Sequence, residues 1–143
     1  MLYKHLLVAV DLTDDSHTVI EHATALAKLC EAKLSLVHVV EPISTSISGE
    51  INVDEKTLHQ ERIDQSRTAL EALCSRHPQL SKESCQLTFG QARREVHRLT
   101  KELGCDLIVT GSHGRHGLAL LLGSTPNALL HDAPCHLLAV HLP

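Results

Sequence analysis

Four of the seven glycines in this chain fall within thirteen residues near its C-terminal end. They are Gly111, Gly114, Gly117 and Gly123. Glycine allows left-handed backbone conformations and lets the main chain come close to a ligand. Successive backbone N–H groups in such a loop can point inward and bind an anion. The residue types and their spacing therefore predict a loop that holds phosphate groups.

Two hydroxyl residues, Ser124 and Thr125, follow the last of these glycines. Pro126 is suited to the first turn of a helix, and the apolar residues 128–130 would continue it. A phosphate at this place would meet the free amides of a helix N-terminus. The two hydroxyls can also donate hydrogen bonds to its oxygens, so this feature favours the same ligand as the glycines do.

The charges around the loop agree with an anionic ligand. After Glu102 the only carboxylates belong to Asp106 and Asp132, and the only cation apart from the histidines is Arg115, inside the loop. The alternative interpretation is that the glycines only make turns. A Walker loop is excluded because no lysine follows Lys101, and the spacing is not that of a dinucleotide-binding G-x-G-x-x-G motif.

Short apolar runs alternate with segments of helical spacing along the rest of the chain. The runs that predict strands buried on both faces of a sheet are 6–10, 34–40, 107–109 and 136–140, and the weaker 84–88 predicts an edge strand. Apolar positions with helical spacing lie within 19–30, 63–73 and 92–103, and Gly104 is suited to end the last of these helices. Such alternation predicts one α/β domain with a parallel sheet and helices on both faces.

Ligands of such sheets bind beyond the carboxyl ends of the strands. This rule points to the segments 11–15, 39–48, 89–91 and 111–124. Asp11, at the end of a buried run, is the best functional candidate among the nearby carboxylates. Asp14, Asp15 or Ser16 are instead expected to cap the first helix. Residues 41–54 predict a loop that could lie over the ligand.

Composition narrows the classes of partner. The 143 residues carry 13 basic and 17 acidic side chains, a net charge of -4, which disfavours nucleic acid and anionic membranes. No apolar run approaches the ~20 residues that a membrane helix needs, and the N-terminus lacks the layout of a signal peptide. Five cysteines without a C-x-x-C pair predict reduced thiols in a cytoplasmic protein.

Twelve histidines raise the possibility of a metal site. His113 and His116 lie three residues apart in the glycine loop, but no second pair has the spacing of a zinc site. The histidines in or beside strands are instead expected to be structural and hydrogen-bonded. They are His5, His38, His136 and His141. We therefore expect no metal bound by the protein itself.

Several segments along the chain, together with the glycine loop, carry a resemblance to a known protein family. They are residues 3–11, His38 with Val39, residues 106–115, Gly123 with Ser124, and Ala133-Pro134-Cys135 before an apolar run. In combination they resemble the universal stress protein A family over nearly the whole chain. The resemblance implies an open five-stranded parallel sheet with strand order 3-2-1-4-5, of the adenine nucleotide alpha-hydrolase-like kind. It also implies a cytoplasmic, homodimeric, ATP-binding protein of the stress response, whose strand 136–142 pairs with its mate.

The resemblance also implies roles for particular residues. Asp11 and the backbone near Ala9 would face the ribose and base, and Val39 would bind adenine through its backbone. The residues that would hold the ribose and phosphates are Thr110, Gly111, His113, Gly114, Arg115, Gly123, Ser124 and Thr125. Mg²⁺ would be held by the phosphates rather than by a protein cage.

One departure from the family pattern bears on this site. Nucleotide-binding members carry G-x2-G-x9-G-(S/T), whereas eight residues separate Gly114 from Gly123 here. The shorter loop could keep the phosphate nest or could misplace Ser124. Retained binding is favoured because the three glycines and the serine are present. The alternatives are a slow ATP hydrolase, disfavoured by the lack of an obvious base or phosphate-binding lysine, and a dimeric interaction protein without nucleotide.

Overall fold

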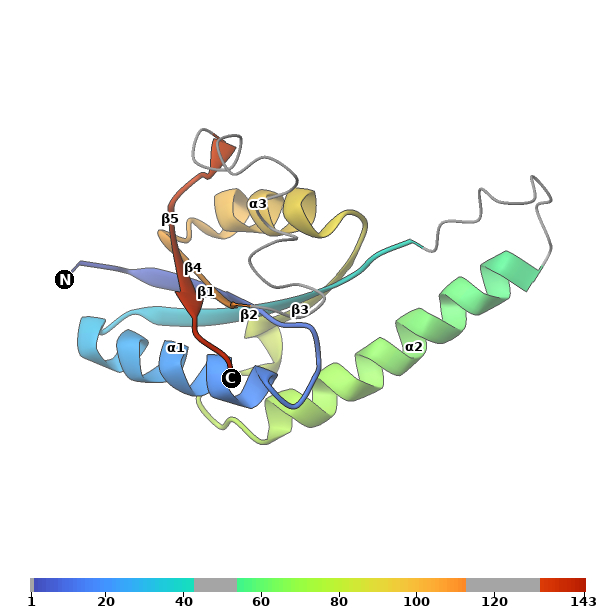
Figure 1. Cartoon of the computed structure of the whole chain (residues 1–143), viewed down its shortest axis with the longest axis horizontal. Coiled ribbons are helices and arrows are strands. Elements are labelled where there is room, and N and C mark those ends of the chain that lie inside the picture. Colours follow the sequence, from blue (N-terminus) through green and yellow to red (C-terminus); the bar gives the residue numbers. More distant parts are fainter. Residues whose placement is uncertain (1, 43–53, 113–131) are drawn as a thin grey trace.

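The computed structural model describes residues 2–42, 54–112 and 132–143 (Figure 1). Its elements in chain order are β1 (His5–Ala9), α1 (Ser16–Cys30), β2 (Lys33–Val40), α2 (Asp54–Ser75), the 3-10 turn η1 (Lys82–Ser84), β3 (Cys85–Phe89), α3 (Ala92–Leu103), β4 (Leu107–Gly111) and β5 (His136–Val140). The five predicted strands are confirmed, with ends that differ by at most two residues. The expectation that 136–140 is buried on both faces is wrong, because β5 lies at an edge of the described sheet and Val140 is its one buried residue. The predicted last helix, from Pro126, lies outside the described residues.

The five strands form one parallel sheet in the order β3-β2-β1-β4-β5. This confirms the strand order 3-2-1-4-5 and places the weaker predicted strand, β3, at an edge. Strand order reverses between β1 and β4, because the chain first builds outward through β2 and β3 and then returns. The carboxyl ends of β1, β2 and β4 therefore meet at the topological switch point, where open α/β sheets bind ligands.

Helices cover both faces of the sheet (Figure 1). Helices α1 and α2 lie on one face, and α3 lies on the other. Leu6 and Val8 of β1 pack into the core beneath α1 and α2, whereas Leu7 and Ala9 pack beneath α3. The alternation of side chains along a strand thus explains why β1 must be apolar at every position.

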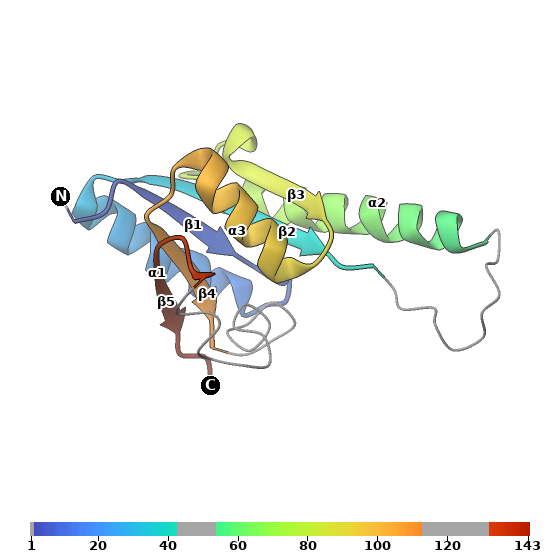
Figure 2. The same ribbon diagram turned by 90° about the horizontal axis from the view of Figure 1, so that it is seen from above.

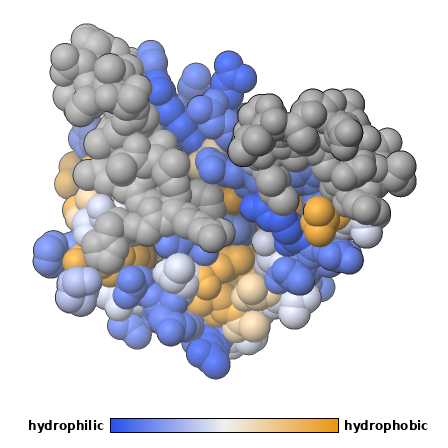
Figure 3. All heavy atoms as spheres, turned by 45° about the vertical axis from the view of Figure 1, so that its right-hand side comes forward, coloured by the Kyte–Doolittle hydropathy of each residue, from blue (hydrophilic) through white to orange (hydrophobic). Residues whose placement is uncertain are grey.

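Aliphatic side chains supply this core. Leu6, Leu7 and Val8 are 0% exposed, and full burial of such a side chain contributes about 1.5–3 kcal/mol. Hydrophilic residues dominate the described surface on the face seen in Figure 3, with apolar residues in separate patches. Among the described residues, no helix has the length and apolar character needed to cross a membrane.

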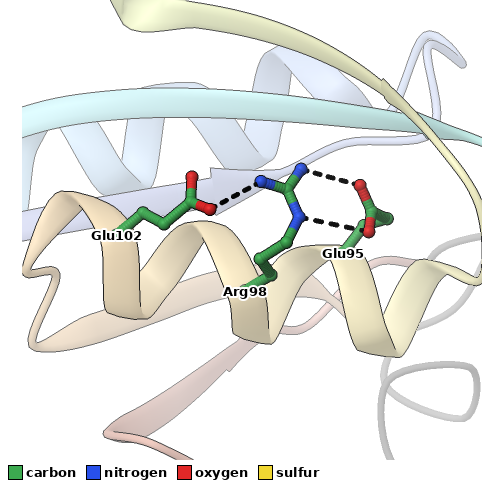
Figure 4. A network of polar contacts seen from close by, with 3 residues as sticks. All are labelled: Glu95, Arg98 and Glu102. Atoms are coloured by element: carbon green, nitrogen blue, oxygen red, sulfur yellow. Dashed lines mark hydrogen bonds and ion pairs between the residues drawn. The ribbon is translucent and has the colours of Figure 1, made fainter.

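Helix α3 carries a compact network of charges on its surface (Figure 4). Arg98 donates to Glu95 from Nη2 at 2.8 Å and to Glu102 from Nη1 at 2.9 Å. These carboxylates raise the pKa of the Arg98 guanidinium above its ordinary value. Because its charge is already balanced by neighbours on the same helix, Arg98 stabilises α3 rather than serving as a phosphate ligand.

Three of the four strand histidines have the hydrogen bonds predicted for them. The pairs are His5 with Ser35 at 2.7 Å, His38 with the Val10 carbonyl at 2.8 Å, and His136 with the Tyr3 hydroxyl at 3.2 Å. The first two bonds join the neighbouring strands β1 and β2 or their ends, and the third joins β5 to the segment before β1. These histidines therefore help to hold the sheet together.

The cysteines correct one prediction. Cys74, in the last turn of α2, and Cys85, the first residue of β3, form a disulfide. The expectation of five reduced cysteines is therefore wrong for this pair, and Cys30, Cys105 and Cys135 are free as expected. The disulfide could not be predicted from the sequence, because only the folded chain brings the end of α2 against the start of β3.

Candidate functional site

A cleft of about 560 Å³ opens beyond the ends of β1 and β2. Strand-end residues form one side of it, among them Asp11, His38 and Val39. Asp11 and Val39, two predicted site residues, therefore line the same cleft although they lie 28 positions apart in the sequence. A pocket of this volume at a topological switch point is the expected location of a small-molecule site.

Helix α2 supplies the other side of the cleft. Arg62, Gln65, Ser66 and Ala69 line it, and the N-terminal half of α2 extends beyond the end of β2 (Figures 1 and 2). Sequence reasoning did not assign these residues to the site. One feature of the sequence could have indicated this wall of the cleft. Ser66 places a hydroxyl in the apolar stripe of α2, whereas a helix face that packs only on a core is apolar throughout.

A narrow crevice of about 10 Å³ lies between the ends of β1 and β4 and the start of α1. Ala9, Asp11 and Gly111, all predicted site residues, line it together with Ser16. Asp11 thus borders both this crevice and the larger cleft. Its position is the link between the part of the site near β2 and the part near β4.

The Asp11 carboxylate is held in place by its own turn. Oδ1 accepts hydrogen bonds from the Thr13 backbone N–H at 3.0 Å, the Thr13 hydroxyl at 2.6 Å and the Ser16 hydroxyl at 3.3 Å. This arrangement corrects the capping prediction, because Asp15 occupies the N-cap of α1 without a side-chain hydrogen bond. Backbone carbonyls, including that of Thr13 to the Ser16 N–H at 3.0 Å, satisfy the first amides instead.

Leu12 follows Asp11 with a φ of 65°, in the left-handed region. In the described part of the chain, Glu31 at φ 54° is the other non-glycine residue of this kind, and it ends α1. Leu12 ends no helix, and a left-handed conformation costs a side chain of its type about 1–2 kcal/mol. Strain of this kind gathers at functional sites, where it fixes the chain in an otherwise disfavoured path.

His38 fastens the floor of the cleft. It is 7% exposed, and its Nδ1 lies 2.8 Å from the Val10 carbonyl oxygen. Since a carbonyl can only accept, Nδ1 carries the proton and donates it. The bond holds the end of β2 against β1 at the point where β1 leaves the sheet, so it positions Asp11 and Val39 relative to each other.

Glu41 closes the far end of the cleft through two contacts. Its carbonyl accepts from Arg62 Nη1 at 2.8 Å, and its carboxylate accepts from the Ala92 N–H at 3.1 Å. The first contact joins β2 to α2, and the second places a negative charge at the N-terminus of α3, where the helix dipole favours it. The first contact therefore fixes the wall that α2 contributes, and the second fixes Glu41 against α3.

The start of the glycine loop is anchored on β5. Thr110 is 0% exposed, and Gly111, at the end of β4, pairs with Val140. The Ser112 N–H then donates to the Val140 carbonyl at 2.8 Å, and the Ser112 hydroxyl accepts from the Leu142 N–H at 2.9 Å. The chain therefore leaves the sheet from a fixed point beside Asp11.

The remaining predicted site residues lie outside the described residues. They are His113, Gly114, Arg115, Gly123, Ser124 and Thr125. Within the described ranges, no group of three or more His, Cys, Asp or Glu side chains is arranged to hold a metal ion. The described part of the site thus presents the Asp11 carboxylate and the strand end at Val39, and most of the residues predicted to hold phosphate lie outside it.

Comparison with known proteins agrees with this architecture. The model of the universal stress protein family matches residues 2–141. Universal stress protein A homolog 1 of Coxiella burnetii is 40% identical over 141 residues, which cover 98% of this chain and 97% of the relative.

Solved structures share the fold at lower identity. A universal stress protein crystallised in complex with cAMP superimposes with a TM-score of 0.67 and 21% identity, over 100% of both chains. The universal stress protein of Archaeoglobus fulgidus in complex with dAMP gives a TM-score of 0.54 and 18% identity, over 97% of this chain and 98% of that one. By its sequence and its fold, this chain belongs to the universal stress protein family.

Proposed function

We propose that this protein binds ATP in the cleft beyond β1, β2 and β4 and acts as a cytoplasmic, homodimeric regulator of the stress response. The observation that carries the proposal is the position of Asp11, which lines both the cleft of about 560 Å³ and the crevice that reaches Gly111. A nucleotide bound in the cleft would pass Asp11 on its way from β2 toward Gly111 at the start of the glycine loop. Relatives that bind cAMP and dAMP make an adenine nucleotide the natural candidate.

The chemistry of the cleft suits one orientation of the nucleotide. Adenine would lie near Val39, where backbone groups at the end of a strand can bind its ring edge. The Asp11 carboxylate would accept hydrogen bonds from ribose hydroxyls, since a carboxylate repels phosphates. The phosphates would then extend past Gly111 into the loop 113–125. Mg²⁺ would be held by the phosphates.

The proposed dimer uses the outer edge of β5. Among the strands that the structure describes, β5 pairs with β4 alone, and Leu138 and Ala139 are exposed. An edge strand with exposed apolar residues can pair with a second copy. Light scattering on the purified protein would test this part, and a Leu138→Lys variant should run as a monomer if the strand forms the interface.

The test of nucleotide binding begins with protein purified without added nucleotide. Denaturation should release adenine nucleotide into the supernatant, and titration calorimetry on stripped protein should give a saturable ATP isotherm. Gly114→Val should abolish the isotherm, because a branched side chain would fill the proposed phosphate nest. Gly104→Asn is the matched control, since Gly104 ends α3 at φ 70°, a conformation that asparagine tolerates.

The outcomes separate the alternatives. Released or titrated ATP that stays intact supports the proposal, and ADP that accumulates with time would indicate the slow hydrolase instead. A stripped protein that binds no ATP would contradict the proposal and would favour the interaction protein whose shorter loop has lost the nucleotide.

A further inference from the structure

A second pocket lies between α2 and β3, on residues that the nucleotide cleft does not use. Its volume is about 550 Å³. Arg67, Leu70 and Cys74 line it from one face of α2, at positions i, i+3 and i+7. Lys82 and Cys85 line it from η1 and the start of β3. The volume falls within the range of small-molecule sites.

The Cys74–Cys85 disulfide forms part of the wall of this pocket. Both residues are half-buried, so a ligand in the pocket would touch a bond that can be exchanged. Burial raises the pKa of the Cys105 thiol to about 12 and also raises that of Cys135, so these two thiols stay protonated and unreactive. Cys30, the third free cysteine, does not line this pocket, so a thiol held in the pocket would meet the Cys74–Cys85 disulfide.

The charges of the pocket select the kind of ligand. Arg67 and Lys82 both line it, and neither has an ion-pair partner in the part of the chain that the structure describes. Glu71 is the one carboxylate among the lining residues, so the pocket keeps a net positive charge. Leu70 and Leu80, both nearly buried, give it an apolar floor. A small molecule with carboxylates and a short apolar or thiol-bearing part matches this lining.

We propose that this pocket is a thiol–disulfide exchange site for low-molecular-weight thiols that carry carboxylate groups. Arg67 and Lys82 attract the carboxylates and bring the thiol to the bond between Cys74 and Cys85. Glutathione, which has two carboxylates and one thiol, is the probe that represents this class.

The exchange is balanced without a further reagent. The thiolate of the ligand attacks Sγ of Cys74, a new S–S bond forms there, and the Cys74–Cys85 bond breaks. Cys85 leaves as a thiolate and takes a proton from solvent, so the products are a mixed disulfide at Cys74 and a free thiol at Cys85. Cys74 lies in the last turn of α2, where the helix dipole disfavours a thiolate, whereas Lys82 lies close to Cys85 in the same wall. Cys85 is therefore the better leaving group.

Mass spectrometry on the whole protein tests the site. Oxidised protein is mixed with reduced glutathione, quenched with acid, alkylated and digested. The expected result is one glutathionyl group on Cys74 and an alkyl group on Cys85. The proposal is overturned if the oxidised protein holds no Cys74–Cys85 disulfide, or if the adduct is found on Cys85 or on the three free cysteines.

A charge comparison tests recognition separately from reactivity. The rate of exchange is measured with glutathione and with the neutral thiol 2-mercaptoethanol, in wild type and in the double variant Arg67→Gln, Lys82→Gln. The ratio of the two rates should fall roughly two- to tenfold in the double variant. Arg76→Gln is the matched control, because Arg76 is exposed and near in sequence but does not line the pocket. An unchanged ratio in the double variant would overturn carboxylate recognition.

Discussion

The two ends of the central sheet each carry an aspartate that accepts backbone hydrogen bonds, yet the two serve different purposes. At the amino end, Asp106 precedes β4 and accepts from the N–H groups of Lys4 at 2.9 Å and His5 at 3.1 Å. At the carboxyl end, Asp11 follows β1 and accepts only from its own turn among the bonds described above, while lining both cavities. The same side chain thus joins distant segments in one place and orders a ligand-facing turn in the other.

The position of the hydrogen-bond partners in the sequence distinguishes the structural carboxylate from the functional one. The partners of Asp106 lie about a hundred residues away in sequence, so its bonds hold β1 against β4 and define the fold. Asp11 accepts hydrogen bonds from Thr13 and Ser16, two and five residues further along the chain, and the next residue, Leu12, has a left-handed backbone. Local partners beside a strained residue indicate a group that is positioned for something other than folding.

The largest expected effect is on stability, when Asp106 at the amino end of the sheet is replaced. Asp106→Ala should lower the free energy of unfolding by about 2–3 kcal/mol, because it leaves backbone N–H groups of Lys4 and His5 without their charged acceptor. Urea unfolding followed by circular dichroism measures this loss. ATP affinity of the folded variant should stay within about twofold of wild type. A loss of affinity as large as that of a site variant would remove the distinction between the two ends.

The second largest expected effect is on ATP affinity, when Asp11 at the carboxyl end of the sheet is replaced. Asp11→Ala should weaken ATP binding roughly tenfold, which corresponds to about 1.4 kcal/mol, since ribose hydroxyls lose a charged acceptor. The variant should lose about 1–2 kcal/mol of stability, because the exposed Thr13 groups can bind water instead, whereas the Ser16 hydroxyl, which is 2% exposed, loses its acceptor. Calorimetric titration and urea unfolding on the same samples give both numbers. Unchanged affinity with lower stability would make Asp11 a second structural aspartate.

A smaller effect is expected from replacing His38, which tests whether the floor of the cleft contributes to ATP affinity. His38→Leu removes the donor to the buried Val10 carbonyl and should cost about 1 kcal/mol of stability. Because the bond sets the distance between Asp11 and Val39, ATP affinity should also fall by a few-fold. His5→Leu, which loses the bond to Ser35 at the amino end, is the matched control and should leave affinity unchanged. Equal affinity losses in both variants would argue against a site-specific role.

The smallest expected effect is the pH dependence of the free energy of unfolding that Asp106 contributes. Burial by itself raises the pKa of Asp106, but hydrogen bonds from the Lys4, His5 and Asp106 N–H groups together hold it below its ordinary value of 3.8. A lowered pKa in the folded state contributes stability above the unfolded value, and this contribution is lost as pH falls through the folded value. The gap in unfolding free energy between wild type and Asp106→Asn should therefore narrow on acidification from pH 6 to about pH 3. A gap that stays constant or widens over this interval would contradict the assignment.

Much of the fold could be predicted from the sequence because β1, β2 and β4 are buried on both faces and must be apolar throughout. Asp11 was predicted because it stands where an apolar run stops, whereas the role of Val39 was predicted from the resemblance to the universal stress protein family. The wall made by Arg62 and Gln65 was not predictable, since it depends on the path of α2 past the sheet. The role of Asp106 was missed for the same reason: it depends on a neighbour that the strand order brings beside it.

Two predictions that rested on local sequence were wrong. Carboxylates before α1 suggested side-chain capping, but the tight turn after Asp11 lets backbone carbonyls satisfy the first amides. Scattered cysteines suggested reduced thiols, but the return of the chain through η1 places Cys85 against Cys74. Both errors concern contacts that only the folded path of the chain creates.

An NMR titration of the ¹⁵N-labelled protein with ATP tests the difference between the two ends most directly. The amide signals of Val10 to Leu12, Val39 to Glu41 and Gly111 to Ser112 should shift in a saturable way, whereas those of Lys4, His5 and Asp106 should stay in place. Shifts confined to the amino end, or a spectrum that ATP leaves unchanged, would contradict a nucleotide site at the carboxyl ends of these strands.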